Sequence, residues 1–163
     1  SAYTLCPVFR NLKDDQIRAV AQNGGVIQVN FYSGFLDSTY FKKQRRFNDA
    51  HRAEADALKG AGKAHYGIEE ALYDKYPHEV RQLRAPVSLL VDHIDYIVRL
   101  AGIDHVGLGS DFDGIESPPL GLDGVQDYPL LTKALLERGY TKKEVRRILG
   151  GNFIRVFKAN SKK

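Results

Sequence analysis

The chain has 163 residues, of which 43% are hydrophobic and 27% charged, the composition of an ordinary globular protein with one domain. No apolar run approaches the ~20 residues of a membrane span, and we recognise no signal peptide or lipid-attachment motif, so the compartment stays open. The net charge of +4 suggests nucleic-acid binding, but the basic run at 42–46 has neither a stacking aromatic motif nor zinc-finger spacing beside it. We therefore favour a solvated basic face.

The first quarter of the chain alternates helix and strand. Residues 1–11 are expected to form a loop, and its cysteine, Cys6, is the only one in the chain, which excludes an internal disulfide. A helix should follow, capped by Asp14 and ended by Gly24, with one apolar face. The β-branched run at 25–31 then predicts a buried strand. A helix followed so closely by a strand is typical of α/β proteins.

Residues 37–84 form a polar, alanine-rich segment with a weak helical pattern. We expect an excursion from the core that consists of one or two surface helices, interrupted by the glycines at 60–62. Such an insertion can be a lid or an oligomer contact, and a homodimer stays open. We favour an insertion without a function of its own.

The second half repeats the helix and strand pattern. Ser88 is expected to cap a helix that Gly102 ends, and a strand begins at about His105. A long loop rich in proline and glycine follows residue 114. Asp127 then caps a helix that ends near Gly139. The last helices are predicted from these residues: a capping box of Thr141 and Glu144, a buried face of Val145, Ile148 and Leu149, and a continuation with Phe153, Ile154, Val156 and Phe157.

Residues 105–114, His-Val-Gly-Leu-Gly-Ser-Asp-Phe-Asp-Gly, carry the strongest functional signal. The apolar first half suits a buried parallel strand, and Asp111 and Asp113 come where this strand should end. Carboxylates rarely occur there unless they are paired or functional, and α/β barrels place their chemistry at the carboxyl ends of strands. Asp-Phe-Asp-Gly is also good turn chemistry, so a plain turn is an equal alternative.

Only two strands are predicted with clarity, and two parallel strands do not make a domain. A complete (β/α)8 barrel needs roughly 250 residues. We therefore expect an α/β chain that is the C-terminal portion of a TIM barrel, or one piece of a two-piece protein. In this interpretation residues 1–163 are part of a single barrel domain, with 37–84 as its helical insertion and the N-terminal strands elsewhere.

Several blocks together resemble the membrane (renal) dipeptidase family, metallopeptidase family M19, over its C-terminal half. The blocks occur in order at 1–3, 10–11, 23–26, 29–32, 92–95, 101–114 and 151–157, and the 37–84 insertion resembles that of bacterial members. The resemblance implies a TIM-barrel hydrolase that cleaves dipeptides. It also implies two zinc ions that share a bridging carboxylate and turn a bound water into the attacking hydroxide.

Residue by residue, the resemblance assigns roles to two positions. Asp111 matches the catalytic aspartate, which holds the bridging water and moves its proton to the leaving amine. Arg10 matches the arginine that binds the terminal carboxylate of the dipeptide, a task that suits a guanidinium fork. Both residues are thus candidates for substrate binding. Asp113 is expected to brace the loop instead.

The resemblance also implies that the zinc ligands lie upstream of this chain, with the last ligand histidine two residues before Ser1. None of the five histidines matches a ligand. His93 is expected to be a packed helix residue, and His105 should lie at the wrong end of its strand. His51, His65 and His78 fall in the insertion, where His51 and Glu54 alone do not make a metal site.

We therefore expect a zinc-dependent dipeptidase as the complete protein, and a chain that alone binds no catalytic zinc and is inactive. Its partners would be a dipeptide substrate and the missing N-terminal half of the barrel. Two alternatives stay open. One is a non-catalytic fragment or assembly module that uses the charged insertion. The other is a zinc amidase of the same fold that acts on a non-peptide substrate.

Overall fold

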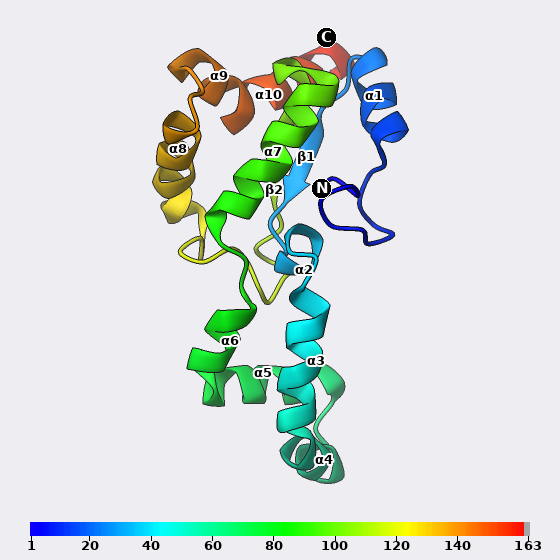
Figure 1. The fold of residues 1–163 in the computed structure, drawn as a ribbon, viewed down its shortest axis with the longest axis vertical. Coiled ribbons are helices and arrows are strands. Elements are labelled where there is room, and N and C mark those ends of the chain that lie inside the picture. The colour runs from blue at the N-terminus through cyan, green and yellow to red at the C-terminus, as the bar shows by residue number, and fades with distance from the viewer. Residues whose placement is uncertain (162–163) are drawn as a thin grey trace.

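A two-stranded parallel sheet lies at the centre of the structure, a computed structural model that describes residues 1–161 (Figure 1). Strand β1 (Ile27–Asn30) pairs with β2 (Val106–Ser110), and Ile27 lies opposite Val106. The register shifts between Val29 and Asn30, so that Asn30 pairs with Ser110. Both predicted strands are present, and β1 is shorter than the run at 25–31 that predicted it.

Small residues on β2 allow the two strands to approach each other around Gln28. A side chain on Gly107 would place its Cβ 2.1 Å from the Gln28 Oε1 atom, and one on Gly109 would lie 3.1 Å from the Gln28 backbone oxygen. Val29 and Val106 are fully buried on the two strands. The close approach at Gly109 involves the Gln28 backbone, so a side chain there would crowd the neighbouring strand, whereas the contact at Gly107 involves the movable end of the Gln28 side chain.

Helices from both ends of the chain cover this sheet (Figure 1). The longest, α7 (Val87–Ala101), contacts both strands and also α1 (Asp14–Gln22). The others are η1 (Ile103–His105), η2 (Val125–Asp127), α8 (Tyr128–Glu137), α9 (Lys142–Arg146), the π-helical turn η3 (Arg147–Gly151) and α10 (Asn152–Asn160). Within residues 1–161, none of the helices has both the length and the apolar character needed to span a bilayer.

Three predicted helix caps differ from the structure. Helix α1 begins at Asp14 itself, because Lys13 precedes it in an extended conformation and donates its backbone N–H to Gln16. Helix α7 begins at Val87, before Ser88, because the extended Pro86 already ends the preceding segment. Asp127 does precede α8, but its carboxylate accepts hydrogen bonds from the backbone of the preceding loop instead of from the helix.

The predicted capping box of the last helices is confirmed, whereas their predicted buried face is only partly correct. The Thr141 hydroxyl accepts from the Glu144 backbone N–H, and Glu144 accepts from the Thr141 backbone N–H at 2.8 Å. Val145 and Ile148 are buried, but Leu149 is 40% exposed. Directly after Leu149, the backbone of Gly150 is non-helical, and this kink separates η3 from α10.

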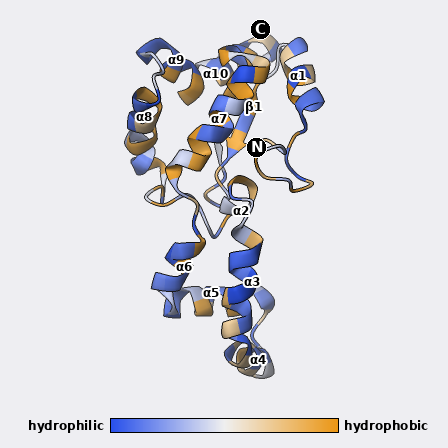
Figure 2. Ribbon diagram, in the orientation of Figure 1, coloured by the Kyte–Doolittle hydropathy of each residue, from blue (hydrophilic) through white to orange (hydrophobic). Residues whose placement is uncertain are grey.

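The insertion at 37–84 contains four helices, not one or two. They are α3 (Tyr40–Ala50), α4 (Arg52–Gly60), α5 (His65–Lys75) and α6 (Pro77–Leu83), and the short α2 (Ser33–Leu36) connects them to β1. The predicted break after Gly60 is present. The insertion extends beyond the carboxyl ends of the strands (Figure 1), and its helices are largely hydrophilic (Figure 2).

A small apolar cluster of its own stabilises the insertion. It consists of Tyr40 and Phe47 from α3, Leu72 from α5 and Leu83 from α6. Helices α3, α5 and α6 thus bury only one or two large side chains each and α4 buries none, which is why the apolar periodicity of the segment is weak. The main core is separate and lies between the sheet, α1, α7, α8 and the last helices.

Candidate functional site

Asp111 directly follows β2 at the carboxyl end of the sheet. The backbone there is left-handed, with φ of 28° at Ser110 and 74° at Asp111, and the Gly114 backbone N–H closes a turn onto the Asp111 carbonyl at 3.0 Å. Non-glycine residues rarely adopt positive φ, and such residues concentrate at functional sites. The two interpretations of this segment therefore coexist, since Asp111 stands at the strand end and is also the first residue of a turn.

Asn30 holds the Asp111 carboxylate from the neighbouring strand, and sequence reasoning missed it. Its Nδ2 donates to Asp111 Oδ2 at 2.8 Å, while its Oδ1 accepts from the Tyr32 backbone N–H at 2.7 Å. The amide is therefore fixed at both ends. The available signal was its position at the end of the first predicted strand, because parallel strands end at the same edge of a sheet.

Gly114 shapes the other side of the carboxylate. A Cβ at this position would lie 2.6 Å from Asp111 Oδ1, closer than a real contact permits. Asp113 is exposed, and its side chain makes no hydrogen bond or ion pair with the other residues of the described range 1–161. The expected bracing role of Asp113 is therefore not seen, because backbone contacts and Gly114 shape the turn instead.

Arg10 is an exposed residue of the loop at 1–12, and its guanidinium carbon lies 5.5 Å from the centroid of the Phe35 ring. The buried Asn11 fixes the loop beside α2, because its Nδ2 donates to the carbonyls of Cys6 and Phe35, both at 2.9 Å. Phe35 belongs to the turn of helix that follows β1. Within residues 1–161, no hydrogen bond or ion pair joins Arg10 to Asp111.

His93 is a packed residue, as predicted, and both of its ring nitrogens are in use. The Ala2 backbone N–H donates to Nδ1 at 3.0 Å, so the ring proton is on Nε2, which donates to the Leu36 carbonyl at 3.1 Å. The ring is fully buried, and this burial lowers the pKa of His93 to about 4. The histidine is therefore neutral near pH 7.

Two of the other histidines, His105 and His51, also make contacts within the fold. His105 lies at the amino end of β2 and bonds to the Gly25 carbonyl at 2.8 Å, so it is remote from the edge that holds Asp111. His51 stacks on Tyr76 and contacts Glu79. Among residues 1–161, no three histidine, cysteine or acidic side chains are grouped so that they could hold a metal ion. The described residues thus do not fit a zinc centre by themselves.

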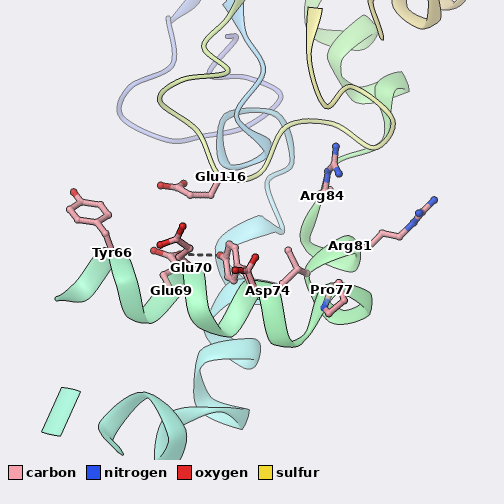
Figure 3. Close-up of a pocket in the computed structure, with 10 residues that line it drawn as sticks. Tyr66, Glu69, Glu70, Asp74, Pro77, Arg81, Arg84 and Glu116 are labelled. Carbon is pink, nitrogen blue, oxygen red and sulfur yellow. Dashed lines mark hydrogen bonds between the residues drawn. The ribbon is translucent and has the colours of Figure 1, made fainter. Parts of the chain in front are cut away.

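A cleft of about 640 Å³ separates the insertion from the loop that follows Asp111 (Figure 3). Figure 3 shows Glu116 of this loop on the side that faces Glu69 and Glu70 of α5. Arg84, at the other end, donates to the carbonyls of Pro118 and Pro119 and pairs with Asp123 at 2.6 Å. These contacts fasten the insertion to the loop that follows Asp111. Asp111 itself is not among the residues that line the cleft.

This chain resembles several solved structures, among them a probable dipeptidase and a metallopeptidase. One is the crystal structure of the probable dipeptidase PvdM from Pseudomonas aeruginosa, with a TM-score of 0.69 and 28% identity over 96% of this chain and 42% of that one. A metallopeptidase from Rhodobacter sphaeroides shares the fold, with a TM-score of 0.66 and 24% identity over 96% of this chain and 33% of that one.

The model of the family described as membrane dipeptidase (peptidase family M19) matches residues 1–163, so the chain belongs to this family. An uncharacterised dipeptidase of Schizosaccharomyces pombe is 34% identical over 97% of this chain, and dipeptidase aclJ of Aspergillus oryzae is 31% identical over 96%. The chain spans only 28% and 27% of the lengths of these two relatives.

Proposed function

We propose that the complete protein is a dipeptidase that hydrolyses the peptide bond of dipeptides, and that this chain supplies the proton-transfer and carboxylate-binding side of its active site. One observation carries the proposal. In a member of a dipeptidase family, a carboxylate at the carboxyl end of a parallel strand, Asp111, is held by an amide from the neighbouring strand. This is the edge at which barrel enzymes carry out their chemistry.

Asp111 and Arg10 divide the work. Arg10 binds the terminal carboxylate of the dipeptide through its guanidinium fork and so orients the scissile bond. Asp111 accepts a proton from the attacking water and transfers it to the leaving amine, while the C–O bond forms and the C–N bond breaks. Zinc is expected for this family, but residues 1–161 bring no metal-ligand set together. The roles proposed for this chain are therefore those of Asp111 and Arg10.

The fold part of the proposal is that residues 1–163 are the C-terminal portion of a (β/α)8 barrel with the insertion at 37–84. Two features support it besides the greater length of the relatives. The described sheet has only two strands, so each has one edge without a partner. Helix α10 also exposes Phe153, Ile154 and Phe157 by 51%, 50% and 61%, a stripe that the first elements of a barrel would cover.

Metal analysis and dipeptide turnover test the proposal directly. The isolated 163-residue chain should contain no stoichiometric zinc and should not hydrolyse dipeptides, because residues 1–161 bring no ligand set together. The complete protein should do both. In the complete protein, replacement Asp111→Asn should lower kcat by roughly 10²-fold or more while the zinc content is unchanged. Turnover by the isolated chain, or full activity of the Asp111→Asn variant, would contradict the assignment.

A further inference from the structure

The apolar face of α7 contains one polar residue, His93, and its presence calls for a reason. Its ring is as fully buried as the side chains of its neighbours Leu90, Ile94 and Ile97. A leucine would fill the same space without removing two polar nitrogens from water. The histidine is therefore present for its hydrogen bonds and not for its volume.

Those hydrogen bonds join two segments that are distant in the sequence. Nδ1 accepts from Ala2, which forms the base of the 1–12 loop, where Tyr3 donates to the Leu12 carbonyl at 2.8 Å. Nε2 donates to Leu36, the last residue of α2. A neutral imidazole has one donor and one acceptor on opposite sides of a rigid ring, so it can connect a backbone N–H to a backbone carbonyl.

The same two segments determine where Arg10 lies. The guanidinium rests over Phe35 of α2, and Asn11 binds the Phe35 carbonyl from the loop side. A shift of the loop relative to α2 would therefore move Arg10 off its support. His93 is a fixed link between the loop base and the helix.

We propose that His93 is a positioning residue for Arg10, because it sets the 1–12 loop against α2 and so places the guanidinium for the substrate carboxylate. The inference rests on the proposed role of Arg10. A displacement of about 1 Å in a binding group is enough to weaken catalysis strongly. The effect of His93 should therefore be visible in substrate binding and should depend on Arg10.

Two substitutions in the complete enzyme separate the two hydrogen bonds. The side chain of His93→Asn can still accept from Ala2 but does not reach Leu36, and that of His93→Gln can still reach Leu36 but loses Ala2. We expect His93→Gln to raise KM for a dipeptide on the order of tenfold, with kcat within about threefold of its original value. His93→Asn should raise KM to a similar extent, because loss of either hydrogen bond breaks the link between the loop base and α2.

A dipeptide amide and the variant Arg10→Ala are the matched controls. With the amide, which has no terminal carboxylate, His93→Gln should change KM by less than about twofold. In the Arg10→Ala background it should add no further rise in KM for the free dipeptide, because the two residues act through one contact. An equal effect on the amide, or a full additive effect in the Arg10→Ala background, would overturn the positioning role.

The experiment distinguishes failure of this inference from failure of the proposed function. If Arg10→Ala does not affect KM for the free dipeptide, the carboxylate-binding role of Arg10 is wrong. If Arg10→Ala raises KM and His93→Gln does not, only the role of His93 is wrong. Should the variants fail to fold, ¹⁵N NMR of the unmodified protein decides. Nδ1 must be unprotonated and Nε2 protonated at neutral pH, and the opposite tautomer refutes the link.

Discussion

At the scale of single residues, the contact between Asn30 and Asp111 allows a test of the role proposed for Asp111. Removal of the amide in Asn30→Ala leaves Oδ2 of Asp111 without its donor and frees the side chain to rotate. In the complete enzyme we expect kcat to fall by about 10–100-fold, the usual effect of losing the partner of a functional group. KM should be unchanged, because Arg10 is not affected. Steady-state kinetics with a dipeptide measure both.

Asp113 provides the control for this substitution. It is a carboxylate in the same turn, but it is exposed and its side chain is not bonded to any residue described in the structure. Asp113→Asn should change kcat by less than about twofold, within the range of neutral surface substitutions. If both variants lose activity equally, the loss reflects the integrity of the turn and not the orientation of Asp111.

The burial of His93 makes stability depend on pH. Burial lowers the pKa of His93 from 6.5 to about 4, and the hydrogen bond to the Leu36 carbonyl and the charge of Asp92 oppose this shift only in part. Between these two values the unfolded chain is protonated at this residue and the folded chain is not. Stability should therefore fall as the pH drops through this window, by about 1.4 kcal/mol per pH unit. Urea unfolding at pH 7 and pH 5 measures the slope. The variant His93→Gln should flatten it, and the exposed His78→Gln should not.

At the scale of elements, the start of α9 is a local feature that can be tested by itself. Thr141 and Glu144 satisfy each other's backbone N–H groups at the first turn. Thr141→Ala removes one of these hydrogen bonds and should lower the free energy of unfolding by about 1 kcal/mol. Urea unfolding measures the change, and Thr141→Ser should retain most of the stability. An unchanged free energy for Thr141→Ala would show that the last helices do not unfold with the rest.

Like the capping box, several other features of the fold could be predicted from the sequence. Both strands and α7 follow from local apolar patterns, and Asp111 follows from its position after one of the strands. The insertion was underestimated because Tyr40, Phe47, Leu72 and Leu83 form a core only after helices α3, α5 and α6 have packed together. The Asn30 contact was missed because it joins two strands that are distant in the sequence, so only the shared edge at which both strands end could have indicated it.

At the scale of the whole molecule, the stripe on α10 tests whether the chain is part of a barrel. The rings of Phe153 and Phe157 stack on each other and are largely exposed. The double variant Phe153→Ser and Phe157→Ser should reduce self-association of the isolated chain, because exposed apolar patches drive association. In the complete protein the same change should lower the free energy of unfolding by about 3 kcal/mol or more, because the rings are then buried.

Sedimentation velocity on the isolated chain and urea unfolding of the complete protein provide the two measurements. Tyr66→Ser is the control, because Tyr66 is 79% exposed on α5 in the insertion and has no place in the barrel wall. The same double substitution should thus have opposite effects: it reduces self-association of the isolated chain and destabilises the complete protein. If the double variant leaves the complete protein as stable as Tyr66→Ser does, no barrel element covers α10 and the proposed architecture is wrong.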